Sequence, residues 1–394
     1  MSKTAYIIDG YRSPVGKSHK GAFKNMRSDD IAVQVVNHLL KEVPNIDPEQ
    51  IDDLILGCAY PEAEQGMQMA RLISLMALPM SVPGLTINRF CGSGLEAMAI
   101  AVQRIQSGMA DVIIAGGTES MTLIAEGGTK FSPNPEMVQK HPDYFINMGL
   151  TAENVAAKYG ISREHQDVFA LESHKKAWRA LVEHKFEDEI VPIIANGRKI
   201  DVDGNVKNIS ERIDQDEHFR PTTSLDALAK LKPAFKKGGT VTAGNSSPLS
   251  DGAAFTLIAS EDFVKKHNLT PKARMLGYGA TGVHPAFMGI GPVEAVPMVL
   301  GKAGLGLEDI DLYELNEAFA AQALAVIQEL ELDPEKVNVN GGAIALGHPL
   351  GATGTKLAIH LIHEMRRRNS KYGMVTACTA GGQGVAGIFE NLQN

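Results

Sequence analysis

The sequence predicts an α/β protein made of two similar halves, the first of which contains a long insertion. Strand-like and helix-like segments alternate along most of the 394 residues, which is typical of a mostly parallel sheet covered by helices. The same order of elements occurs twice, and the stretch 120–249 interrupts the first copy. Long structureless loops are uncommon inside compact domains, so this insertion is expected to be functional.

Apolar runs predict the strands of the first half, and apolar residues at helical spacing predict its helices. Ser28 or Asp29 is a plausible N-cap of the first helix, Gly108 ends the third, and Gly116 and Gly117 end the fourth strand. The expected strands are 4–9, 51–57, 84–89, 111–115 and 254–259, and the expected helices are 26–41, 66–75 and one that follows Cys91.

The second half repeats this order. Cys91 and the glycine-rich turn around His348 then occupy equivalent strand-to-helix junctions. Ligand sites form where strands of such sheets end, so both junctions are candidate site positions. The expected strands are 273–277, 309–315, 336–340, 373–377 and 385–390, and the expected helices are 292–303, 317–330 and 351–368.

The insertion differs in character from the two halves, because it contains loops, helices and many basic residues. Its predicted helices, 151–159 and 163–184, suggest a lid or ligand-binding subdomain. Composition alone favours the simpler interpretation of solvated surface lysines. The expected division is a first half of 1–119 with 250–270, a loop domain of 120–249, and a second half of 271–394.

Composition excludes several classes of function. The chain is 44% hydrophobic and 21% charged with a net charge of −8, which gives no support for nucleic-acid binding. Its three cysteines include no Cys-x-x-Cys pair, so neither a disulfide framework nor a structural zinc site is expected. His360 and His363 lack a third metal ligand. Without a signal-like leader or a long apolar run, we expect no membrane insertion and a cytoplasmic location.

Two cysteines stand where strand-like residues meet glycine-rich turns. Cys91 precedes a predicted helix, whose positive end lowers the pKa of a thiol. Cys378 lies near the C-terminus, and His348 lies between the two in sequence. A histidine and a second thiol could share the proton transfers of covalent acyl chemistry. The alternative for each cysteine is a small buried apolar side chain, as we expect for Cys58.

Taken together, these motifs resemble those of the thiolase family from end to end. The resemblance implies a thiolase-like five-layered αβαβα fold, with two duplicated α/β halves and an inserted loop domain. It also implies a homo-oligomer, dimer or tetramer, that acts on coenzyme A thioesters and binds no permanent cofactor or metal. The segments that carry it are 88–94, 115–121, 148–155, 240–247, 316–319, 341–349 and Cys378 with its following glycines.

The resemblance also implies a role for each site residue. Cys91 would be the nucleophile that carries the acyl group as a thioester, and Cys378 would be the acid and base at C2 and toward the CoA thiol. His348 would activate Cys91 and donate to the thioester oxygen, helped by a water held by Asn316. The backbone N–H of Ala380 would donate to the adduct oxygen, although the family usually has glycine there and alanine is costly at positive φ.

Two further residues match family positions that contact coenzyme A. Ser247 would contact the pantetheine arm. Arg220 would contact the nucleotide end, which suits guanidinium because it pairs with phosphate and stacks on rings. A solvated surface arginine is the alternative for Arg220.

The expected activity is degradative cleavage of 3-ketoacyl-CoA to acetyl-CoA and a shortened acyl-CoA. Asn147 stands where acetoacetyl-CoA thiolases usually have histidine, which favours the degradative type. The alternative is an acetyl-CoA acetyltransferase that condenses two acetyl-CoA molecules. A non-catalytic acyl-CoA or lipid carrier is a third possibility, because fold does not fix function. The sequence does not settle chain-length preference, direction, dimer against tetramer, or partner enzymes.

Overall fold

The computed structural model describes residues 3–200 and 204–393, whose strands form one long mixed sheet and a separate two-stranded hairpin. The first half supplies β1 (Ala5–Arg12), β2 (Gly16–Lys17), β3 (Asp53–Gly57), β4 (Gly84–Ile87), β5 (Val112–Ser120) and β8 (Ser250–Ser260). The second half supplies β9 (Ala273–Gly282), β10 (Leu312–Leu315), β11 (Tyr372–Thr379) and β12 (Gln383–Asn391).

The strand order shows the duplication directly. The order is β10-β11-β12-β9-β1-β8-β5-β3-β4, with β2 paired to β8. Read outward from the centre, β1-β8-β5-β3-β4 corresponds to β9-β12-β11-β10. The halves meet where Ile7 of β1 pairs with Ala273 of β9. The predicted duplication is therefore confirmed.

The prediction of a mostly parallel sheet is wrong. Only β3–β4, β3–β5 and β10–β11 pair in parallel, whereas β8 and β12 run antiparallel to both of their main neighbours. The last strand of each half lies between the first strand of that half and the strand of the long sheet that precedes it in the sequence: β8 lies between β1 and β5, and β12 lies between β9 and β11. The tight turn from β11 to β12 dictates the reversed direction, because a short hairpin can join only antiparallel strands.

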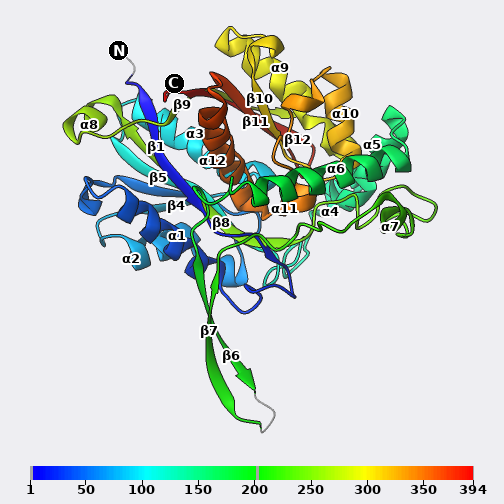
Figure 1. Ribbon diagram of the computed structural model, residues 1–394, viewed down its shortest axis with the longest axis horizontal. Helices are drawn as coiled ribbons and strands as arrows, with labels where there is room; N and C mark the ends of the chain where they lie inside the picture. The colour runs from blue at the N-terminus through cyan, green and yellow to red at the C-terminus, as the bar shows by residue number, and fades with distance from the viewer. Residues whose placement is uncertain (1–2, 201–203, 394) are drawn as a thin grey trace.

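Helices cover both faces of the sheet and separate its halves, which gives five layers (Figure 1). Alternate residues of β3 face different layers: Leu54 and Leu56 pack with the outer helices of the first half, and Ile55 packs with the central pair. The outer layers are α1 (Ser28–Glu42) and α2 (Met69–Ala77) on one side, and α9 (Gly291–Ala303) and α10 (Ala320–Glu329) on the other. The central layer is α3 (Ser93–Gln106) and α12 (Leu350–Arg368).

Three local expectations are corrected. Arg27, rather than Ser28 or Asp29, is the N-cap of α1, and its side chain makes no capping bond. β5 continues through its glycines to Ser120. The expected strand 336–340 is reduced to one bridge between Tyr313 and Val337.

Asn338 explains the lost strand, because its φ of +46° is incompatible with an extended chain. Its side chain takes over the pairing instead. The Asn338 amide accepts from the backbone N–H of Leu315 at 2.9 Å and donates to the Leu315 carbonyl at 2.8 Å. Both groups of Leu315 are therefore satisfied without a further strand.

The insertion contains the two predicted helices and a hairpin that projects from the body of the protein (Figure 1). Asn147 caps α5 by accepting from the backbone N–H of Gly149 at 2.8 Å. No helix in the described part of the chain is both long and apolar enough to span a bilayer. The elements of the insertion are α4 (Pro135–Lys140), α5 (Met148–Tyr159), α6 (Arg163–Val182), β6 (Ile193–Ile200), β7 (Val206–Ile213) and α7 (Leu225–Ala229). Outside the insertion, α8 (Glu261–Lys266) follows β8.

Buried ion pairs tie the insertion to both halves. Arg12 of β1 donates to Glu189 at 2.7 Å and to Asp216 at 2.8 Å, and both carboxylates belong to the insertion. Glu189 also accepts from His360 of α12 at 2.9 Å. Buried charges are stable only when paired in this way. These buried ion pairs thus anchor the insertion to the interior of the protein.

Candidate active site

Cys91 lies in a strained turn between β4 and α3. The preceding Phe90 has a φ of +45°, which is rare for an aromatic residue and is typical of functional sites. Hydrogen bonds fix the turn, because the Phe90 N–H donates to the Asn88 side chain at 2.8 Å and the Ser93 hydroxyl donates to the Phe90 carbonyl at 2.7 Å. The local sequence therefore holds the Cys91 sulfur in one position.

The protonation state of Cys91 differs from the expected one, which was an ionised thiol. Burial, then the charge of Cys378 and that of Glu126, raise the Cys91 pKa well above its ordinary value. The backbone N–H groups of Ala380 and of Cys91 itself act in the opposite direction, but they do not outweigh burial. The thiol is thus protonated in the resting site, and a base must remove its proton.

His348 has the properties of such a base. Its Nδ1 lies 2.6 Å from the Thr353 hydroxyl, which itself donates to the Pro349 carbonyl at 2.9 Å. Because that hydroxyl proton is used, the bond network assigns the ring proton to Nδ1 and leaves a lone pair on Nε2. Burial, followed by the positive charge of Lys356, lowers the His348 pKa to about 3, so the ring is neutral.

Asn316 lies directly against this imidazole. Its Nδ2 is 3.3 Å from His348 Nε2, and its buried Oδ1 contacts no hydrogen-bond donor among the described residues. A buried amide oxygen needs a partner, so it can accept from a water or from a substrate donor. This geometry suits the water-holding role implied for Asn316.

Cys378 is the next-to-last residue of β11. Burial raises its pKa to about 12, so this thiol also carries its proton at neutral pH. The residues after it are Ala380, with no positive φ, and Gly381 and Gly382, with φ of +79° and +83°. The expected cost of alanine at position 380 is therefore absent, because the following glycines take the left-handed conformation.

Packing shows how these residues meet. Cys91 packs with Leu350 at the start of α12, next to the His348 turn. A methyl group on Gly92 would lie 3.0 Å from the side chain of Thr379, which follows Cys378. The influence of Cys378 and Ala380 on the Cys91 pKa places all three at one site. The structure thus brings together the predicted Cys91, His348, Asn316, Cys378 and Ala380.

Of the two predicted coenzyme A residues, only Arg220 is among the residues that line a cavity of about 160 Å³. Arg220 lines it, and so do Ser246 and Pro248, the neighbours of Ser247. Ser247 itself is half-buried, and its N–H donates to the Ala318 carbonyl at 3.0 Å. A cavity wall with a cationic side chain suits an anionic ligand.

Sequence reasoning missed three residues that support the His348 turn. The Ser250 hydroxyl accepts from the His348 N–H at 3.0 Å and lies 3.1 Å from His218 Nε2. Burial lowers the His218 pKa to about 4. Only the position of His218, two residues before Arg220, could have drawn attention to it. The third missed residue, Thr353, lies one helical turn into α12.

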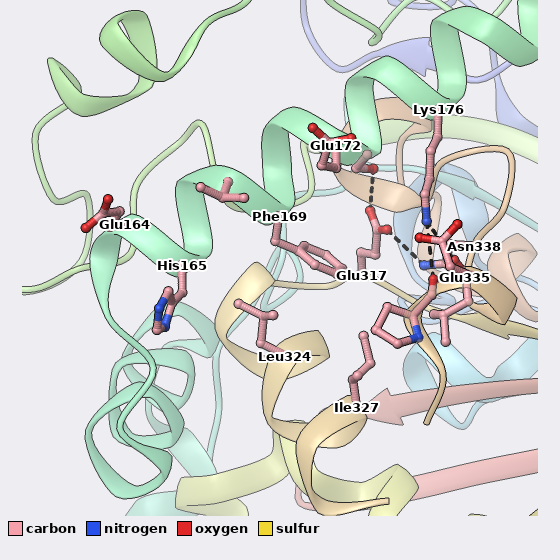
Figure 2. Close-up of a pocket in the computed structure, with 14 residues that line it drawn as sticks. Glu164, His165, Phe169, Glu172, Lys176, Glu317, Leu324, Ile327, Glu335 and Asn338 are labelled. Carbon is pink, nitrogen blue, oxygen red and sulfur yellow. Dashed lines mark hydrogen bonds between the residues drawn. The ribbon is translucent and has the colours of Figure 1, made fainter. Parts of the chain in front are cut away.

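A separate cavity of about 510 Å³ lies between α6 and α10 (Figure 2). Phe169, Leu324 and Ile327 line its apolar part, and Glu317 lies at its inner side. Glu317 accepts from the Ser173 hydroxyl at 2.7 Å and from the Ile344 N–H at 3.2 Å. Glu317 therefore braces the loop that leads to His348, whereas the reactive thiols lie outside this cavity.

The fold and this centre define a member of a known enzyme class. Residues 5–262 match the family model "Thiolase, N-terminal domain", and residues 269–391 match "Thiolase, C-terminal domain". The chain therefore belongs to the thiolase family. Thiolases use coenzyme A as a substrate and need no permanent cofactor.

Individual relatives are similar over their whole length. A 3-ketoacyl-CoA thiolase of Bacillus subtilis is 51% identical over 98% of this chain and 99% of its own. A 3-oxoadipyl-CoA/3-oxo-5,6-dehydrosuberyl-CoA thiolase of Escherichia coli is 44% identical over 99% of this chain and 100% of its own.

Solved structures give the same result. Human mitochondrial 3-ketoacyl-CoA thiolase has a TM-score of 0.88 and 42% identity, with 99% of each chain covered. Bacillus anthracis acetyl-CoA acetyltransferase has a TM-score of 0.89 and 40% identity, also with 99% of each chain covered. The five-layered thiolase fold is confirmed.

Proposed function

We propose that this protein is a degradative 3-ketoacyl-CoA thiolase, which cleaves 3-ketoacyl-CoA with coenzyme A into acetyl-CoA and a shortened acyl-CoA. One observation carries the proposal: two protonated thiols and a neutral imidazole share a site in which the Ala380 N–H acts on Cys91. Covalent acyl transfer requires this combination of nucleophile, base, acid and oxyanion donors.

In the first step, His348 Nε2 takes the proton of Cys91, and the thiolate attacks the C3 ketone. The negative oxygen that forms would accept from the N–H groups of Cys91 and Ala380, which already favour negative charge at this position. One such donor contributes roughly 3 kcal/mol in comparable acyl-transfer sites.

In the second step, the bond between C2 and C3 breaks. The acyl fragment stays on Cys91 as a thioester, and the electron pair passes to the enolate of acetyl-CoA. Protonated His348 and the water held by Asn316 would donate to the enolate oxygen. Cys378 gives its proton to C2, and its high pKa keeps that proton available at neutral pH.

In the third step, the Cys378 thiolate takes the proton of the incoming CoA thiol. The CoA thiolate attacks the acyl group, and the Cys91 thiolate leaves and recovers its proton from His348. All groups return to their starting protonation states. Arg220 and Ser247 would hold coenzyme A within the loop domain 120–249, between the halves formed by 1–119 with 250–270 and by 271–394.

Two activities remain possible within the family, and the degradative one is favoured. It is supported by the names of several relatives and by Asn147, which here caps a helix. The alternative is synthesis by an acetyl-CoA acetyltransferase, which a 40% identical solved structure keeps open. The presence of all three catalytic side chains argues against a non-catalytic carrier.

Initial rates of CoA-dependent cleavage, measured with 3-ketoacyl-CoAs from four to sixteen carbons, test this choice. We expect cleavage of several chain lengths. Activity restricted to the four-carbon substrate would favour the acetyltransferase. Binding of acyl-CoA without turnover would favour a carrier.

We also infer a homo-oligomer in the cytoplasm. The edge strand β4 is only half-buried, and nearby Met67 and Met80 are 90% and 80% exposed, which suits a protein interface. The projecting β6–β7 hairpin offers a second contact surface. Light scattering after size exclusion tests the inference, and a monomeric mass would contradict it.

A further inference from the structure

The segment 115–121 carries part of the family resemblance, yet the proposed reaction steps use none of its residues. It contains Glu119, the next-to-last residue of β5, whose side chain is fully buried. A buried carboxylate is stable only where hydrogen-bond donors surround it. The partners of Glu119 therefore show which segments it holds in place.

One oxygen of Glu119 joins the two halves of the protein. Glu119 Oε2 accepts from the Ala59 N–H at 2.7 Å and from the Gly351 N–H at 2.9 Å. Ala59 lies in the loop after β3 of the first half. Gly351 lies in the first turn of α12 in the second half, three residues after His348. A negative charge at this end of a helix is also favoured by the helix dipole.

The other oxygen holds the same loop a second time. Glu119 Oε1 accepts from the Tyr60 N–H at 3.3 Å and from the Gln65 side-chain amide at 2.7 Å. Burial raises the pKa of Glu119 and these bonds lower it; because all four partners donate, the arrangement suits the charged carboxylate. A methyl group on Gly351 would lie 2.7 Å from the Gly57 carbonyl, so the loop and α12 are already in close contact.

The loop after β3 is bonded in turn to the Cys91 turn. The Asn88 side chain donates to the Ala59 carbonyl at 2.9 Å and accepts from the Phe90 N–H at 2.8 Å. Ala59 is thus bonded to Glu119 through its N–H and to the strained turn before Cys91 through its carbonyl. A continuous series of hydrogen bonds therefore joins the Cys91 turn to the start of α12 through Glu119.

Resting on the proposed function, we propose that Glu119 is a positioning residue, which sets where the His348 imidazole lies relative to the Cys91 sulfur. Glu119 acts through the two turns that it joins. The proton transfer from Cys91 to His348 depends on this placement, and a shift of about 1 Å in such a site can cost on the order of 100-fold in rate.

Glu119→Gln tests the inference, because it keeps the size of the side chain and replaces one acceptor oxygen by an NH2 group. Whichever way the amide turns, a donor of the loop after β3 loses its acceptor, so the loop must shift relative to α12. For cleavage of 3-oxohexanoyl-CoA, kcat should fall by on the order of 10- to 100-fold, with KM changed by less than about threefold. An unchanged kcat would overturn the inference.

Asp53→Asn is the matched control, since it alters another buried carboxylate at the opposite end of β3. Asp53 accepts from the Leu54 N–H at 2.8 Å and from Arg104. Its kcat should equal that of the wild type. A loss as large as that of Glu119→Gln would show that any buried carboxylate of this layer has the same effect, and would overturn the inference.

A second readout needs no turnover. The rate of Cys91 alkylation by iodoacetamide near neutral pH, located by peptide mass spectrometry, reports how readily His348 takes the Cys91 proton. Glu119→Gln should slow it by about 10-fold in the wild type and by less than about twofold in His348→Asn, because the placement of a base matters only where the base is present. Equal losses in both backgrounds would show a general structural effect and would overturn the inference.

Gln65→Met provides a milder variant if Glu119→Gln does not fold. It removes one donor to Glu119 and keeps the carboxylate, so alkylation should slow by about threefold in the wild type and remain unchanged in His348→Asn. No loss, or equal losses, would then overturn the inference. If the wild type cleaved no 3-ketoacyl-CoA, the proposed function would fail, and the alkylation rates would still decide whether Glu119 positions His348.

Discussion

The junction before α3 and the junction before α12 occupy equivalent places in the two halves of the chain, and they present different chemistry to one site. The first carries the Cys91 sulfur in a strained turn, and the second carries the His348 imidazole. The two helices pack so closely that a methyl group on Gly94 would lie 2.9 Å from the Gly351 carbonyl. The duplication thus brings the proposed nucleophile and its proposed base together from distant parts of the sequence.

The two reactive thiols also differ, in their burial and in the groups that surround them. Cys91 is half-buried and receives backbone N–H groups, whereas Cys378 is fully buried in a small apolar cluster. Both thiols are protonated at rest, but two backbone N–H groups, those of Ala380 and Cys91, favour negative charge on Cys91, whereas the N–H that acts on Cys378 is its own. The surroundings of the two thiols, and not their residue type, support the different roles that we propose for them.

The largest effect is expected from replacing the acid. Cys378→Ala should reduce CoA-dependent cleavage by roughly 10³- to 10⁴-fold, because no group remains to protonate C2 of the enolate. Acyl exchange between an acyl-CoA and Cys91 should persist. An unchanged cleavage rate would show that Cys378 takes no part in the mechanism, and the proposed division of roles between the two thiols would then be wrong.

Loss of the base comes next. His348→Asn should lower kcat by roughly 10³-fold, since asparagine can hold a hydrogen bond but cannot accept the Cys91 proton. The matched control is His363→Asn, because burial also lowers the pKa of His363, to about 4, on the helix that follows the His348 turn. Steady-state rates of both variants, measured on folded protein, distinguish a catalytic role of His348 from the general effect of removing a buried imidazole. Equal losses would contradict the role of His348.

The contact between the two central helices can be broken without touching the chemistry. In Gly354→Ala, the added methyl group would overlap the backbone and side chain of Leu95, so the free energy of unfolding should fall by about 1–3 kcal/mol. Gly301→Ala in α9 is the control, because open space surrounds that position and alanine favours a helix. Urea denaturation at fixed protein concentration measures both. A neutral Gly354→Ala would show that the helices are less closely packed.

The smallest effect concerns pH. The folded state holds His348 neutral with a pKa of about 3, while the unfolded chain binds a proton near pH 6.5. Stability from this residue is therefore complete above pH 6.5 and declines as the pH falls toward 3. Between pH 7.5 and 5, the wild type should lose about 2 kcal/mol more than His348→Asn. Urea unfolding at both values checks this difference, and equal losses would contradict a neutral His348.

Much of the fold could be predicted from local pattern. The spacing of apolar residues predicts the central helices, and the repeated order of elements predicts the duplication. The direction of β8 and β12 could not be predicted, since it depends on which strands they lie between. The missing strand at 336–340 also has a tertiary cause, because only the position of Leu315 shows why the Asn338 side chain replaces a backbone ladder.

The site was predictable to a similar degree. Cys91, His348 and Cys378 stand in glycine-rich motifs that mark them in the sequence, whereas Thr353 and His218 stand in no motif. Their roles depend on contacts between distant segments. The protonated state of Cys91 was missed for a related reason: the helix position is visible in sequence, but the burial that outweighs it is not.

One measurement tests the central claim, that Cys91 carries the acyl group. The protein is incubated with 3-oxohexanoyl-CoA in the absence of free coenzyme A and examined by intact-protein mass spectrometry. The wild type and Cys58→Ala, which alters a buried thiol beside Glu119, should both gain the mass of a butyryl group, and Cys91→Ala should gain nothing. A butyryl adduct on Cys91→Ala, together with continued turnover, would contradict the account.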